Sequence, residues 1–112
     1  MNRAAFPLTL TIASAGTASN VVEIPNGYDL AGFIFPAMTG TAVTVQAGAN
    51  STTLYDVYVV NGASTNTKVS LTVDATGRYV LLDNVKGFRY LKLTSNGAEA
   101  ANRTITAILV GC

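Results

Sequence analysis

The chain of 112 residues contains no histidine, no tryptophan and only one cysteine. Imidazole is the commonest general base and a frequent metal ligand, so its absence excludes most hydrolase designs and most metal sites. The sequence also has no cysteine cluster, no glycine-rich phosphate loop and no Gly-x-Ser-x-Gly motif. We therefore expect a protein that is not an enzyme, with no catalytic residue, no cofactor and no metal site.

The remaining reactive side chains do not change this expectation. Paired carboxylates could support glycoside hydrolysis, but most acidic residues of the chain lie in or beside turns, where Asp usually bonds its own backbone. These acidic residues are Glu23, Asp29, Asp56, Asp74, Asp83 and Glu99. Cys112 has no partner within the chain for a disulfide, so the fold must be held by its core or by assembly.

Charged residues make up only 12% of the chain and the net charge is +1, whereas an average soluble domain has roughly 25% charged residues. Threonine, serine, asparagine and glycine take their place. A chain this close to neutral has no strong attraction for nucleic acid or for an anionic membrane. Its weakly charged surface has two interpretations: a small secreted β-domain, or a surface that is largely buried against neighbours.

Several basic residues fall in the C-terminal third of the chain. We interpret them as solvated or interfacial charges, matched in part by Asp74, Asp83 and Glu99, and not as a track for phosphates. These basic residues are Arg78, Lys86, Arg89, Lys92 and Arg103.

The N-terminal segment MNRAAFPLTLTIASAG does not have the uninterrupted apolar stretch of a signal peptide, because Thr9 and Thr11 alternate with apolar residues as in a strand. No stretch approaches the roughly 20 apolar residues that would span a membrane. We expect a protein that is made in the cytoplasm and has no membrane span. Pro7 resists strand pairing, so residues 1–7 are expected to form an N-terminal arm, or a frayed terminus, and residues 8–112 a single domain.

The dominant pattern is a two-residue alternation of apolar and polar side chains, as in LTLTI (8–12) and TAVTV (41–45). About eight to nine short runs of this kind, bounded by Gly, Pro, Asn or Asp, predict an all-β fold, an antiparallel two-sheet β-sandwich with jelly-roll-like topology. One strand is expected over residues 52–60 and a hairpin over residues 87–106. The expected core residues are Leu10, Ile12, Phe33, Phe35, Val43, Val45, Leu71, Val73, Leu91, Leu93, Ile105 and Ala107.

The order of several segments resembles a family of small structural proteins of tailed-bacteriophage virions. The segments are LTLTIASAGTAS, YDLAGFIFPAMTGTAVTVQAG, TTLYDVYV, GRYVLLD, GFRYLKLTSNG and ANRTITAIL, which together cover nearly the whole chain. The resemblance implies a β-sandwich on the phage particle. It implies a capsid decoration, or cement, protein that sits on the outer surface of the head and bridges subunits of the major capsid protein.

Decoration proteins of this kind occupy three-fold positions, so the resemblance also implies a homo-oligomer, most simply a trimer. The N-terminal arm is the candidate tether to the capsid, with Arg3, Phe6 and Pro7 as candidate contact residues.

A second interpretation stays open, because the RYV and FRYLKL segments also resemble discoidin-type sugar-binding sandwiches. The protein would then be an adhesin module of a phage tail or head fibre that binds host glycans. Tyrosines could line such a sugar site, although Tyr on a strand more often lies at the edge of a core or at an interface. The tyrosines are Tyr28, Tyr55, Tyr58, Tyr79 and Tyr90.

Overall fold

The computed structural model describes residues 5–61, 65–81 and 89–111, and within these ranges every regular element is a β-strand. No helix in this part of the chain is long and apolar enough to cross a membrane. The strands are β1 (Ala5–Ile12), β2 (Val22–Glu23), β3 (Tyr28–Phe35), β4 (Ala42–Gly48), β5 (Tyr55–Asp56), β6 (Tyr58–Asn61), β7 (Thr65–Lys68), β8 (Ser70–Thr72), β9 (Arg78–Leu81), β10 (Tyr90–Ser95) and β11 (Arg103–Gly111).

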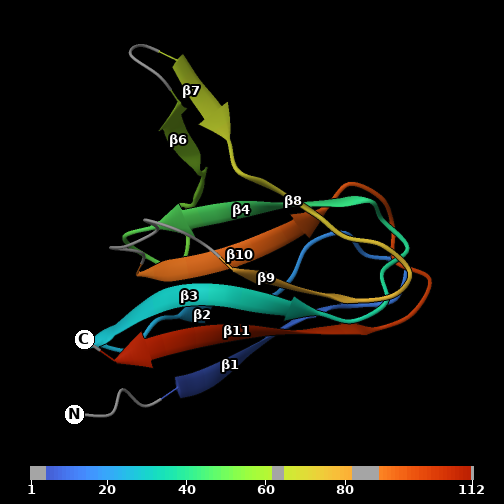
Figure 1. Cartoon of the computed structure of the whole chain (residues 1–112), viewed down its shortest axis with the longest axis horizontal. Helices are drawn as coiled ribbons and strands as arrows, with labels where there is room; N and C mark the ends of the chain where they lie inside the picture. Colours follow the sequence, from blue (N-terminus) through green and yellow to red (C-terminus); the bar gives the residue numbers. More distant parts are fainter. Residues whose placement is uncertain (1–4, 62–64, 82–88, 112) are drawn as a thin grey trace.

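Two antiparallel sheets form a sandwich, as the sequence predicted (Figure 1). One sheet has four strands in the order β1-β11-β3-β9. The other has the order β2-β10-β4-β5, and β8 pairs with β4 beside β5. Apart from the insertion β5–β7 and the step from β4 to its neighbour β8, each strand lies in the other sheet from the strand before it, so that β1-β11-β3-β9 faces β2-β10-β4-β8 in the order of a jelly roll.

The core lies between the two sheets and contains every residue that the alternation predicted to be buried. The side chains of Leu10, Phe33, Leu91 and Ile105 are completely inaccessible to solvent, at 0% exposure. The agreement follows from strand geometry, because alternate side chains of a strand point to the same face. Ile24, Leu30, Met38 and Leu109 are also buried.

The last two long strands do not form the hairpin that the sequence predicted over residues 87–106. β10 pairs with β4 and β2 in the five-stranded sheet, whereas β11 pairs with β1 and β3 in the other sheet. The segment from Asn96 to Asn102 therefore crosses from one sheet to the other. Both strands still fill the core, because each directs its apolar face toward the opposite sheet.

The single strand expected over residues 52–60 is also wrong, since the chain changes direction near Val57. The backbone N–H of Val57 donates to Val45 O, and the carbonyl of Val57 accepts from Val69 N. After Val57 the chain leaves the sandwich as the hairpin β6–β7, which stands away from the sheets on the side of β4 (Figure 1). Tyr58 and Lys68 are opposite each other at the base of this hairpin.

The N-terminal strand begins earlier than expected, so Ala5, Phe6 and Pro7 belong to β1 and not to an arm. β1 is an edge strand that pairs along its whole length with β11. The backbone N–H of Thr11 donates to Asn20 Oδ1, 2.8 Å away, and so points away from β11. Because backbone groups two residues apart point the same way, the nitrogen of Pro7 also faces the free edge. Proline therefore removes no hydrogen bond from the ladder here.

Candidate functional site

The outer surface of the four-stranded sheet is the most distinctive surface of the described chain. Pro7, Thr9 and Thr11 lie on it from β1, since the alternate residues Leu10 and Ile12 point into the core. The register then places the partners of these residues on the same side. We call this surface the uncharged face and define it by Pro7, Thr9, Thr11, Ile34, Tyr79, Thr104, Thr106, Ile108 and Val110.

One row of side chains crosses all four strands of the uncharged face. Thr9 is opposite Thr106, Thr106 is opposite Ile34, and Ile34 is opposite Tyr79. Ile34 is 40% exposed and Tyr79 is 57% exposed. Cross-strand neighbours in such a row are about 4.5–5.5 Å apart. The row therefore presents methyl groups and an aromatic ring to solvent on a nearly continuous strip.

Charge is distributed unequally between the two outer surfaces of the sandwich. Within the described residues the only charged side chain in register with the uncharged face is Asp29, which is opposite Val110 at the end of β3. The outer surface of the five-stranded sheet instead carries ion pairs, Glu23 with Arg89 at 2.9 Å and Asp56 with Lys68 at 3.1 Å. The two surfaces must therefore suit different neighbours.

The predicted capsid-contact residues are only partly placed by the structure. Arg3 and the side chain of Phe6 lie outside the described part of the chain, although the backbone of Phe6 is opposite Leu109. Pro7 is exposed and lies opposite Ile108, at the margin of the uncharged face.

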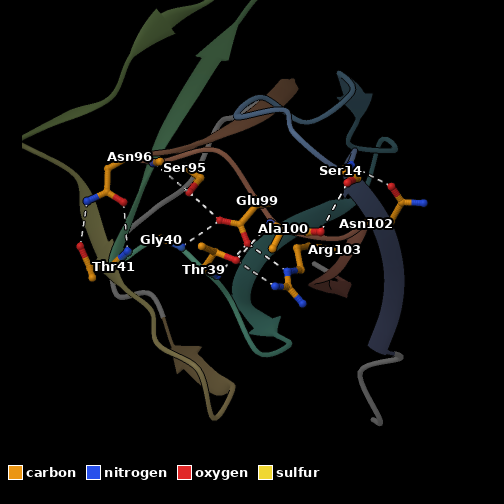
Figure 2. Close-up of polar contacts among 11 residues, drawn as sticks. Ser14, Thr39, Gly40, Thr41, Ser95, Asn96, Glu99, Ala100, Asn102 and Arg103 are labelled. Carbon is orange, nitrogen blue, oxygen red and sulfur yellow. Dashed lines mark hydrogen bonds and ion pairs between the residues drawn. The ribbon is translucent and has the colours of Figure 1, made fainter.

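A polar cluster lies at one end of the sandwich, where Glu99 joins three chain segments (Figure 2). The Glu99 carboxylate is buried and accepts four hydrogen bonds, which we call the Glu99 clasp. The donors are Thr39 N (2.8 Å), Gly40 N (3.0 Å), Ser95 Oγ (3.0 Å) and Arg103 Nε (3.0 Å).

The backbone of Glu99 extends the same cluster to the N-terminal part of the chain. Its carbonyl accepts from Ala15 N at 2.7 Å and its N–H donates to Gly16 O at 3.0 Å. The loops after β1 and β3 are therefore both tied to the segment that crosses between β10 and β11. The loop after β1 is held by the backbone of residue 99, whereas the loop after β3 is held by the Glu99 carboxylate.

The electrostatics of the Glu99 clasp favour the ionised acid. Burial alone raises the pKa of the Glu99 carboxyl, but the hydrogen bonds from the backbone N–H groups of Thr39 and Gly40, from Arg103 and from Ser95 outweigh it and leave the pKa below its ordinary value. Within the described residues no buried side-chain nitrogen or oxygen lacks a partner. Every polar atom of the clasp is thus satisfied, which is typical of a structural cluster.

The sequence analysis named Glu99 only as a partial match for the basic residues and did not predict its burial; the residue is 1% exposed. A signal was present in the spacing of Glu99 and Arg103, which form an i,i+4 ion pair. Asp74 and Arg78 have the same spacing and pair at 2.8 Å, but they remain partly exposed. Asp83 and Lys86 lie outside the described residues.

The tyrosines do not gather into one platform. Tyr79 belongs to the uncharged face, whereas Tyr55 and Tyr58, exposed by 70% and 55%, lie in the insertion that leads into the hairpin β6–β7. Tyr90 is half-buried under Arg89, whose guanidinium carbon is 6.0 Å from the ring centroid. Tyr28 packs against the core. An interaction through aromatic side chains would thus use one of two separate places.

No group of three or more His, Cys, Asp or Glu in the described ranges could hold a metal ion. Four acidic residues are each paired with their own cation, in the pairs described above.

Comparison of the chain with protein-family models, with curated proteins and with solved structures gave no match. The class of protein that the structure defines is therefore a small jelly-roll sandwich with one uncharged sheet face.

Proposed function

We propose that this protein is a non-enzymatic structural protein of a phage particle. It decorates the outer surface of the capsid after synthesis in the host cytoplasm, and it stabilises the head by bridging subunits of the major capsid protein. The observation that carries this proposal is the uncharged face, where Ile34 and Tyr79 are exposed on neighbouring strands. Jelly rolls are common among capsid and lectin domains, so the fold is compatible with the proposal but does not decide it.

The physical basis of such binding is burial of weakly polar surface. The methyl groups of isoleucine and threonine favour burial, whereas a threonine hydroxyl needs a hydrogen-bond partner when it is covered and an unpaired charge would oppose burial more strongly still. Association with the capsid should consequently depend little on salt, because salt screens charges and not apolar contacts.

The test is a reconstruction of purified virions of the phage that encodes this chain, together with quantitative mass spectrometry. We expect a copy number comparable to that of the major capsid protein, and heads that lose thermal stability when the gene is deleted. A few copies confined to the tail tip would refute the proposal.

A second candidate function is favoured by Tyr55 and Tyr58. Tyr58 is opposite Lys68, which pairs with Asp56, and Gln46 Nε2 donates to Asp56 Oδ1 at 3.1 Å, while Tyr55 directly precedes Asp56 in the chain. Aromatic rings next to amide and carboxylate groups can stack on and hydrogen-bond to sugars. Binding on a glycan array that is lost in Tyr55→Ala and Tyr58→Ala, but kept in Tyr79→Ala, would favour the adhesin over the decoration protein.

A further inference from the structure

We propose that the uncharged face is the contact between two copies of this chain, which pack face to face through β1, β11, β3 and β9 about a two-fold axis. This inference assigns to a second copy the same face that supports the proposed function, so in such a dimer the capsid would have to contact other surfaces of the sandwich. Sandwich sheets pack in the same way inside a domain, at about 10 Å and with their strands about 30° apart. The resulting dimer would have four layers of sheet, with the two four-stranded sheets in the middle and a five-stranded sheet on each outer side.

The first argument concerns charge. A surface that covers the uncharged face must not place a charge against it, since that charge would lose water without gaining a partner. The outer surface of the five-stranded sheet does not meet this condition, because Glu23, Arg89, Asp56 and Lys68 lie there. The same face of a second copy does meet it, and a two-fold arrangement brings like face to like face.

The second argument concerns area. The strands β1, β11, β3 and β9 have 8, 9, 8 and 4 residues, and at about 4.8 Å spacing and about 3.4 Å rise they cover about 470 Å² on each copy. A pair would then bury about 950 Å², close to the roughly 1,000 Å² that a specific interface needs, so the dimer should be weak and reversible. The exposed Ile34 and Tyr79 lie in the cross-strand row at which the two faces would meet.

The third argument concerns the alternative of pairing through the free edge of β1. Pro7 presents no N–H at that edge, and the N–H of Thr11 is already bonded to Asn20 Oδ1. Natural sheets protect their edges by such means. Pairing of two copies through the edge of β1 is therefore disfavoured, which removes one competitor of contact through the sheet face.

The test measures the oligomeric state of the purified chain by sedimentation equilibrium over a range of concentrations. We expect a reversible dimer. Thr106→Lys should weaken it at least about tenfold, since it places an unpaired charge on each of the two uncharged faces that come into contact. The matched control is Thr44→Lys. Thr44 is also a half-buried threonine in a central strand, flanked by Thr94 and Ser70 on the opposite sheet, and its substitution should leave the dimer intact.

Circular dichroism establishes that each variant is folded. If Thr106→Lys does not fold, Tyr79→Ser decides the question against Tyr55→Ser, because both tyrosines are more than half exposed. A monomeric wild type, a dimer unaffected by Thr106→Lys or Tyr79→Ser, or the trimer that the family resemblance implies would each overturn the inference. None of these outcomes would alter the copy number in virions, so the capsid proposal is judged separately.

Discussion

Replacement of Glu99 by alanine should be the most destabilising single change at the loop end of the sandwich. The substitution removes the acceptor of four hydrogen bonds, of which those from Gly40 N and Ser95 Oγ are buried. A buried donor without a partner costs about 1–3 kcal/mol, and removal of one member of a buried ion pair costs about 3–5 kcal/mol. We expect a loss of about 3–5 kcal/mol, which comes mainly from the two buried donors left without an acceptor; Arg103 adds less than a fully buried partner would, because it is 20% exposed and can regain water.

The measurement is the free energy of unfolding from urea titration, with Glu23→Ala as the matched control. Glu23 pairs with Arg89 at 2.9 Å, but its side chain is 48% exposed. Such a surface pair contributes about 0–1 kcal/mol. If Glu99→Ala costs less than about 1 kcal/mol at an unchanged urea dependence, the clasp does not hold the loops and the argument from buried hydrogen bonds is refuted.

The same residue predicts a pH dependence with a defined sign. The pKa of Glu99 in the folded protein lies below its ordinary value of 4.5, so its contribution to stability is present above that value and is lost as the pH falls through the folded pKa. Glu99→Gln should therefore lose less stability than the wild type between pH 5 and pH 3. Some acid dependence must remain, because hydrogen bonds from Thr76 and Arg78 lower the pKa of Asp74 to about 2.

Two further changes test the packing in the same assay. Gly40→Ala should destabilise the protein by about 1–3 kcal/mol, because a Cβ there would collide with Ser95 Oγ and lie 2.8 Å from Asn96 Oδ1. The control is Gly97→Ala, which should have little effect because its Cβ would meet nothing within 4 Å. Equal losses in both variants would contradict the close approach at Gly40. Leu93→Ala should lower the free energy of unfolding by about 2–5 kcal/mol, because Leu93 is fully buried. Ile34→Ala should lower it by less than about 1 kcal/mol, because the Ile34 side chain is 40% exposed. A loss below about half a kcal/mol for Leu93→Ala would mean that the register of β10 is shifted by one residue.

The core could be predicted from the sequence because burial in a sandwich follows the two-residue alternation of each strand. Leu91 and Leu93 face inward whichever strand lies beside them, so a local pattern is sufficient. The neighbours of a strand are a different matter. β10 and β11 are joined by a short loop rich in turn residues, which favours a hairpin, but β11 is central between β1 and β3. Contacts with the first third of the chain outweigh the local preference.

The Glu99 clasp could not be predicted for the same reason. The residues around Glu99 are small or polar, as in an exposed loop, and the donors at Thr39 and Gly40 lie about sixty positions earlier in the chain. A buried acid becomes acceptable only when the fold brings such donors to it. The uncharged face could be predicted in part, less fully than the core but more fully than the Glu99 clasp. The Thr residues of β1 and β11 alternate plainly in the sequence, yet only the register places them beside Ile34 and Tyr79.

The low charge of the chain gains a more specific meaning from this arrangement. Most charged side chains of the described residues belong to four ion pairs. The pair of Glu99 with Arg103 lies at the loop end with its carboxylate buried, and two other pairs lie on the outer surface of the five-stranded sheet. The four-stranded sheet has almost none on its outer surface. A protein that needed only solubility would gain by charge on both surfaces. The sparing of one sheet face therefore argues that this face is covered by a neighbour, which is a second copy in the proposed dimer or a capsid subunit in the proposed function.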